Sequence, residues 1–173
     1  MDVNDLLVEG YDRLPDLVSA AVDGLTADQL AKAPAPGANT VGWLVWHLTR
    51  VQDHHVAELL DDDQVWVTSG WAARFGRDGD PSDTGYGHSP AEVAKLRADG
   101  ADALTGYHAV VAARTRVFLA GLQPADLDRV VDERWDQPVT LGVRLVSVLD
   151  DDLQHAGQAA YVRGLLERRP PER

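Results

Sequence analysis

The chain contains no cysteine among its 173 residues. Disulfide bonds, thiolate metal ligands and a cysteine nucleophile are therefore excluded, and any thiol chemistry must use a thiol from a second molecule. The sequence also lacks an apolar run of about 18 residues, which a membrane-spanning helix needs. Its first residues carry acids where a secretory signal peptide has a basic start. These absences predict a cytoplasmic protein with no membrane partner.

Positive charge is scarce. Lysine and arginine together number 16, against 28 aspartate and glutamate residues, which gives a formal net charge of −12. A field of this sign repels phosphate backbones and anionic lipids, so we expect no nucleic-acid partner. The length and the hydrophobic content of 45% fit a single domain, residues 1–173, with a proper core.

Apolar residues recur at three- and four-residue steps in four long stretches, which is the pattern of amphipathic helices. A short hairpin is expected at 129–139, where β-branched residues flank a polar centre. The sequence therefore predicts an all-α four-helix bundle with one long crossover loop. The four helical stretches are residues 2–23, which Pro15 interrupts, 41–60, 90–119 and 141–168.

The expected crossover loop, residues 64–89, is rich in glycine, aspartate and serine. A loop of this length inside a compact domain is typical of a lid or the wall of a site. We expect its aromatic residues to fold it down onto the helices, and the tryptophans to fill the core. A ligand wall or a homodimer face is the alternative role for these rings. The tryptophans concerned are Trp43, Trp46, Trp66 and Trp71.

Three side chains are expected on the inward faces of two helices. His47 shares a stripe with apolar residues, and Asp151 precedes His155 by four residues, which places both on one helix face. An ionised buried aspartate needs a positive partner: an arginine, a protonated histidine or a metal. Two imidazoles and a carboxylate match the ligand sets of Zn²⁺, Fe²⁺, Ni²⁺ and Mn²⁺ with positions left open. A hydrogen bond between Asp151 and His155 without any metal is the competing interpretation.

Two segments carry a family resemblance. The run NTVGWLVWHLTRVQD at 39–53 resembles the second-helix signature of the DinB-like four-helix-bundle superfamily, and DDLQHAGQAAYVRGLL at 151–166 resembles its last-helix signature. In the mycothiol-dependent branch, which includes the N-terminal domain of maleylpyruvate isomerase, the matching positions are metal ligands. The resemblance implies a divalent metal, commonly Zn²⁺ or Ni²⁺, held by His47, Asp151 and His155. It also implies a small thiol, such as mycothiol or bacillithiol, that the metal converts to a thiolate.

The sequence departs from that branch in three places. Asp151 stands where glutamate is more usual, and Gln158 stands where the mycothiol branch often has histidine. The chain ends at Arg173, without the extra C-terminal domain of maleylpyruvate isomerase, so that particular isomerisation is not expected.

The leading functional interpretation is a metal-dependent thiol S-transferase or thiol-assisted isomerase that acts on a small electrophile. One alternative is a hydrolase that uses a metal-activated water. His54 would then be a general base, or a residue that holds a metal ligand in place. The other is a metal- or small-molecule-binding protein without turnover. His108 is a further candidate to face the cavity, while Arg163 binds a ligand carboxylate or pairs with a neighbouring acid.

Overall fold

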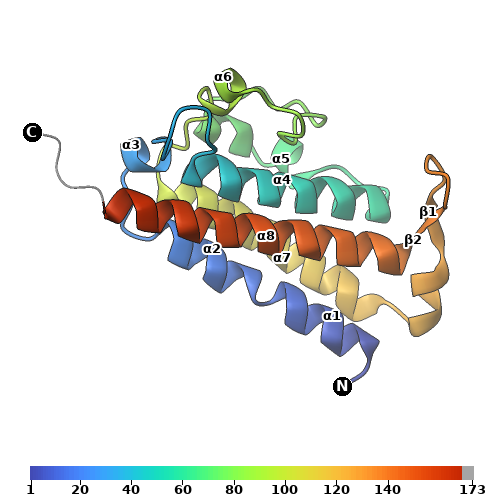
Figure 1. Ribbon diagram of the computed structural model, residues 1–173. Helices are drawn as coiled ribbons and strands as arrows, with labels where there is room; N and C mark the ends of the chain where they lie inside the picture. Colours follow the sequence, from blue (N-terminus) through green and yellow to red (C-terminus); the bar gives the residue numbers. More distant parts are fainter. Residues whose placement is uncertain (169–173) are drawn as a thin grey trace, which may run out of the picture.

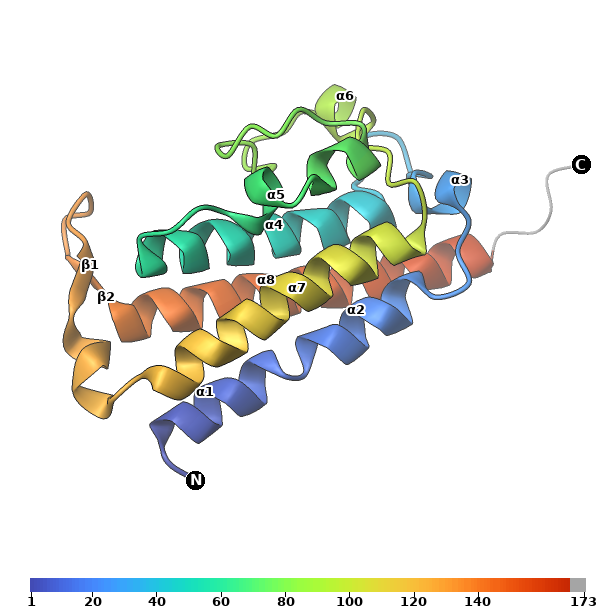
Figure 2. The same cartoon turned by 180° about the vertical axis from the view of Figure 1, so that it is seen from behind.

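The computed structural model describes residues 1–168, and its helices run side by side along the molecule (Figure 1). Neighbouring helices contact one another in a closed ring, in which α4 contacts α8, α8 contacts α2, α2 contacts α7, and α7 contacts α4 (Figure 2). This arrangement confirms the predicted all-α four-helix bundle. The bundle is formed by α1 (Val3–Tyr11) with α2 (Leu14–Val22), α4 (Val41–Leu60), α7 (Ala101–Gly121) and α8 (Leu141–Glu167).

The two helices that carry the candidate ligands both begin at a threonine cap. The Thr40 side chain accepts a hydrogen bond from the Trp43 amide at 3.1 Å, and α4 begins at the next residue. Thr140 caps α8 in the same way, through the Val143 amide. Each cap satisfies an amide that has no partner within its helix, so the sequence fixes where both helices begin.

Two of the expected helices are broken. The stretch 2–23 divides into α1 and α2, with Pro15 in the first turn of α2, where its missing N–H costs nothing. The stretch 90–119 is likewise not one helix, because it divides into α6 (Pro90–Val93) and α7. Between them the amides of Arg97 and Asp99 donate to the carbonyls of Phe75 and Arg74. These tertiary hydrogen bonds replace the helical ones.

The remaining elements are short. The strands β1 (Val130–Asp132) and β2 (Val139–Thr140) pair antiparallel, which confirms the predicted hairpin. No helix within residues 1–168 is long and apolar enough to cross a bilayer. The other short elements are α3 (Ala27–Leu30), α5 (Val65–Thr68), η1 (Trp71–Phe75) and η2 (Pro124–Asp128).

The crossover loop is folded onto the helices by most of its aromatic residues, as its composition predicts, although Tyr86 is exposed. Trp66 is fully buried, and its ring centroid lies 5.9 Å from that of Trp46 and 5.5 Å from that of Tyr107. Trp43 and Trp46 are also core residues, whereas Trp71 is half-buried against Tyr107. This cluster gives the loop a fixed position over the helix.

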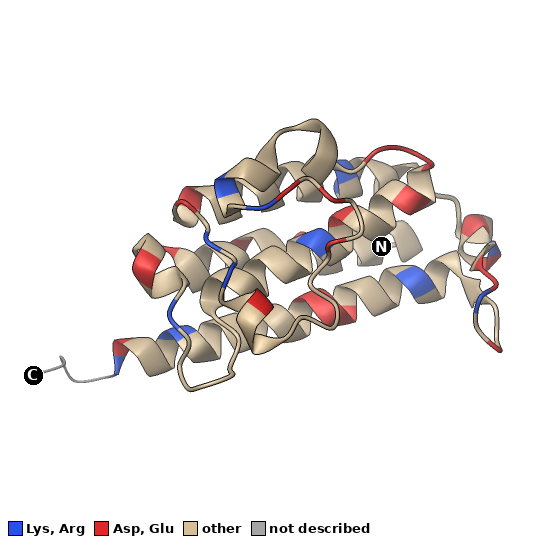
Figure 3. Cartoon of the chain, turned by 90° about the horizontal axis from the view of Figure 1, so that it is seen from above, with Lys and Arg blue, Asp and Glu red and all other residues tan. Residues whose placement is uncertain are grey.

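The charged residues are dispersed in the view from above. Figure 3 shows the basic positions scattered among acidic ones on the helices and loops, with no continuous basic stripe on this side. The absence of a nucleic-acid partner stays a prediction from the net charge.

Candidate metal centre

The structure brings His47 of α4 together with Asp151 and His155 of α8. One ligand atom from each of these side chains lies within 4.8 Å of the others. His155 Nε2 is 3.6 Å from Asp151 Oδ1, and the two imidazole rings meet edge-on with centroids 4.7 Å apart. Ligand atoms around a tetrahedral Zn²⁺ are about 3.4 Å apart, given bonds of about 2.1 Å. Small side-chain movements would therefore suffice to close the triad around an ion.

The orientation of His47 is set by the crossover loop. Its Nδ1 lies 2.5 Å from the carbonyl oxygen of Thr84, so Nδ1 carries the proton and the lone pair is on Nε2. Its ring also stacks on Trp43, with centroids 4.6 Å apart. Burial lowers the pKa of His47, against the opposing effect of the Thr84 hydrogen bond. A neutral imidazole with one nitrogen already donating to the protein is the usual form of a metal-binding histidine.

His155 and Asp151 form an ion pair, and the second ring nitrogen of His155 is also hydrogen-bonded. Gln158 Oε1 lies 3.0 Å from His155 Nδ1, so this nitrogen donates and Nε2 is directed to the acid. Asp151 raises the pKa of His155. Burial opposes ionisation of Asp151, but the hydrogen bond and the positive charge of His155 hold the pKa of Asp151 below its ordinary value. Gln158, one of the departures from the family pattern, thus orients a candidate ligand.

The donor set passes a direct test of fit to a cation. Asp151 Oδ2 is buried, and it has no hydrogen-bond partner among residues 1–168. A buried carboxylate oxygen without a donor is costly unless something positive meets it. A divalent ion held by this oxygen and the two imidazoles would satisfy it, so the residues present fit the metal that the resemblance implies.

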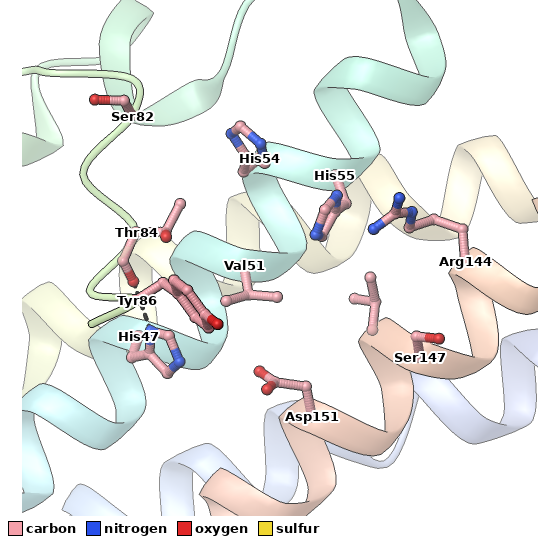
Figure 4. A pocket seen from close by; sticks show the side chains of 11 residues that line it. His47, Val51, His54, His55, Ser82, Thr84, Tyr86, Arg144, Ser147 and Asp151 are labelled. Atoms are coloured by element: carbon pink, nitrogen blue, oxygen red, sulfur yellow. Dashed lines mark hydrogen bonds between the residues drawn. The ribbon is translucent and has the colours of Figure 1, made fainter. Parts of the chain in front are cut away.

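A cavity of about 420 Å³ opens beside the triad (Figure 4). His47 and Asp151 lie at one end, and Arg144 and His55 lie at the other. The crossover loop forms part of the wall, as the length of that loop predicts, through Ser82, Thr84 and Tyr86.

A buried arginine fixes the loop segment that reaches His47. Arg50 is fully buried, and its Nε and Nη2 donate to the carbonyls of Asp83 and Pro81, both at 3.0 Å. Its Nη1 lies 3.5 Å from the buried Asp53 carboxylate, which also accepts 2.7 Å from the Tyr107 hydroxyl. The helical periodicity did not predict this role of Arg50, although a charged residue within an apolar helix run was a signal for it.

Comparison with known proteins identifies the family of the chain. A family model described as mycothiol S-transferase matches residues 7–168. The chain belongs to this family. The mycothiol S-transferase family lies within the DinB-like superfamily, so the predicted resemblance is confirmed.

A solved structure has the same fold over almost the whole chain. It is described as the crystal structure of the conserved protein of locus from Enterococcus faecalis, and its sequence is 32% identical to that of this mycothiol S-transferase family member. The match covers 98% of this chain and 99% of that one, with a TM-score of 0.89. No curated protein matches the chain.

The other candidate residues are distributed between the cavity and the core. His54 lines the cavity, whereas His108 turns into the core, where burial lowers its pKa to about 4. Arg163 pairs with a neighbouring acid, Glu167, at 2.8 Å. A second cluster, formed by His54, His55 and Glu58, also places its ligand atoms within 4.8 Å of one another.

The deepest acid near the triad is Asp152, which sequence analysis missed. Asp151 was expected on the inward stripe, but Asp151 is only half-buried and Asp152 is fully buried. Both Asp152 oxygens lack a hydrogen-bond partner among the described residues, and burial raises its pKa well above the usual range. The signal was available, since Asp152 lies four residues after Val148 and four before Ala156, both in the core.

Proposed function

We propose that this protein is a divalent-metal-dependent thiol S-transferase, which joins a low-molecular-weight thiol to a small electrophile. The observation that carries the proposal is the convergence of His47, Asp151 and His155 beside a cavity that His47 and Asp151 line, with an unpartnered buried carboxylate oxygen on Asp151. A Zn²⁺ or Ni²⁺ ion bound there would lower the pKa of a thiol, so that the thiolate forms at neutral pH. Membership of the mycothiol S-transferase family supports mycothiol as the thiol.

The protein side chains prepare this site before a thiol arrives. Thr84 and Trp43 hold His47 in one orientation with Nε2 unprotonated. Asp151 supplies a negative charge, which offsets part of the charge of a divalent ion. The cavity leaves room beside the triad for the thiol and the electrophile, so both reactants could be held together.

The hydrolase alternative is weakened by the hydrogen bonds around His54. Arg50 donates to Gln64 Oε1 at 2.8 Å, which fixes the orientation of the amide. The Nε2 of Gln64 lies 3.0 Å from His54 Nδ1 and donates to it. Burial lowers the pKa of His54, so the neutral ring carries its proton on Nε2. In this arrangement His54 can donate a hydrogen bond from Nε2, but its acceptor nitrogen is already occupied, so it is not set up to accept a proton from water.

Turnover of a fluorogenic haloalkyl bimane tests the proposal. The zinc-loaded protein should consume the probe much faster when mycothiol is present, and His155→Ala should abolish this acceleration. Arg163→Gln is the matched control, because Arg163 lies on the same helix but pairs with Glu167 outside the cavity. Consumption without any thiol would instead support a hydrolase. A thiol-dependent shift in melting temperature without turnover would support a binding protein.

The cytoplasmic location and the possible homodimer stay predictions.

A further inference from the structure

One face of α8 joins two kinds of chemistry. Arg144, Val148 and Asp151 all line the cavity, at positions separated by four and three residues (Figure 4). Seven residues of helix place Arg144 about 10 Å along the axis from Asp151, at a rise of about 1.5 Å per residue. The cavity therefore has a candidate metal ligand at one end and a guanidinium at the other.

The guanidinium of Arg144 has unused hydrogen-bonding capacity. Its Nη2 donates to Asp132 Oδ2 at 2.7 Å, and no other hydrogen bond of this group is found within residues 1–168. Arg134 also occupies both oxygens of Asp132, through Nε and Nη2 at 2.8 Å. Asp132 thus divides its single charge between two guanidinium groups. Since a guanidinium carries five N–H donors, Arg144 retains donors for a ligand in the cavity.

The surroundings of Arg144 favour an anion over a cation. Burial, followed by the positive charge of Arg144, lowers the pKa of His55 to about 4, so His55 adds no charge at neutral pH. The nearby acid Glu58 lies 3.7 Å from Arg134, which offsets its charge outside the cavity. A metal at the His54, His55 and Glu58 cluster would have to bind beside Arg144. We therefore assign no metal to that cluster.

We infer that Arg144 forms a subsite for a carboxylate, or a similar anionic group, on the small molecule that occupies the cavity. A guanidinium presents paired N–H groups that match the two oxygens of a carboxylate. The anion would lie at the end of the cavity away from the triad, and the reacting end of the ligand would lie near His47 and Asp151. The inference rests on the proposed function only for which end of the ligand reacts.

Two thiols of equal length test the subsite. In calorimetric titrations of the zinc-loaded full chain, 6-mercaptohexanoate should bind at least tenfold more tightly than the neutral 6-mercaptohexan-1-ol. Arg144→Gln should remove this preference, and Arg144→Lys should retain part of it as a point charge. Arg134→Gln is the matched control, because it alters the same Asp132 pair but leaves the cavity wall unchanged.

Equal affinity of the two thiols for the wild-type protein would overturn the inference without any variant. A carboxylate preference that survives in folded Arg144→Gln would overturn it as well. The proposed function is judged separately by repeating the titrations after chelation. If zinc removal leaves the affinity of both thiols unchanged, the metal–thiol proposal fails, whereas the affinity ratio still reports on Arg144.

The anionic group could belong to the thiol or to the electrophile, and a thiol-free probe distinguishes them. Hexanoate is titrated into protein saturated with 6-mercaptohexan-1-ol. Simultaneous binding would place the anion on the electrophile, and competition would place it on the thiol; both results support the subsite if Arg144→Gln abolishes hexanoate binding. Hexanoate binding that Arg144→Gln leaves unchanged would contradict it.

Discussion

The carbonyl oxygen of Thr84 lies 2.5 Å from Nδ1 of His47, although the two residues are 37 positions apart in the sequence. This hydrogen bond joins the crossover loop to the candidate metal centre. Because it fixes which nitrogen of His47 carries the proton, the position of the loop determines whether Nε2 is available as a ligand. The loop is therefore part of the site as well as its wall.

Replacing Arg50 by methionine should destabilise the protein by about 3–5 kcal/mol, since it leaves the buried Asp53 charge without its positively charged partner. Denaturant unfolding followed by circular dichroism measures this loss. Arg74→Gln is the control, because Arg74 is more exposed in its pairs with Asp99 and Asp102 and should cost at most about 1 kcal/mol. If Arg50→Met costs no more than this control, the anchoring role of Arg50 is wrong.

Metal content tests the triad directly. Protein purified without a chelator should hold up to one divalent ion per chain, and His155→Ala should lose it, because an open site cannot spare one of three protein ligands. His55→Ala serves as the control, since it disrupts the second histidine cluster and leaves the triad intact. Elemental analysis showing equal metal in wild type and His155→Ala would contradict the assignment.

Charge at position 151 should matter more than side-chain size. Asp151→Asn should weaken metal affinity at least tenfold, or about 1.4 kcal/mol, because it removes the carboxylate charge and keeps the shape. Asp151→Glu should be neutral or harmful, because Asp151 already lies 3.6 Å from His155 and a longer side chain would be crowded. Asp150→Asn, at an exposed acid next to it, is the control. Unchanged affinity in Asp151→Asn, measured by competition with a chelating dye, would exclude the carboxylate as a ligand.

The protein should become less stable as the pH is lowered, and His108 should account for part of this loss. Burial lowers the pKa of His108 to about 4 in the folded state, against about 6.5 in the unfolded chain. Above pH 6.5 both states are neutral and His108 contributes no pH dependence. Between pH 6.5 and 4 only the unfolded state binds the proton, so unfolding becomes easier by up to about 1.4 kcal/mol per pH unit, or about 3 kcal/mol in total.

The variant His108→Leu isolates this effect. The free energy of unfolding, measured at several pH values, should fall less steeply in the variant than in the wild type below pH 6.5. Parallel curves for the two proteins across this interval would show that His108 titrates normally in the folded state.

Local sequence periodicity predicted much of this molecule. Apolar residues spaced three and four positions apart define the helix faces on which His47, Asp151 and His155 lie, because side-chain direction along a helix follows from spacing alone. The division between α6 and α7 was not predictable in this way, since it depends on hydrogen bonds from Arg97 to a distant carbonyl.

The residues that contact the site from the loops could also not be predicted from helical periodicity. Thr84 reaches His47, and Asp132 reaches Arg144, across loops whose path the sequence pattern does not encode. The finding that Asp152, and not Asp151, is the most buried acid shows how precisely periodicity can predict burial. Neighbouring residues on a helix differ by about 100° in direction, so a small error in the assumed inward face selects the wrong one.

The most direct test of the account is thiol binding to the cobalt-substituted protein. Cobalt-loaded wild-type protein titrated with mycothiol should develop a near-ultraviolet band from sulfur ligation, which saturates at one thiol per chain. His155→Ala should show no such band, and Arg163→Gln should match the wild type. A wild-type spectrum that mycothiol leaves unchanged, or an identical band in His155→Ala, would contradict the proposal that His47, Asp151 and His155 form the thiol-activating centre.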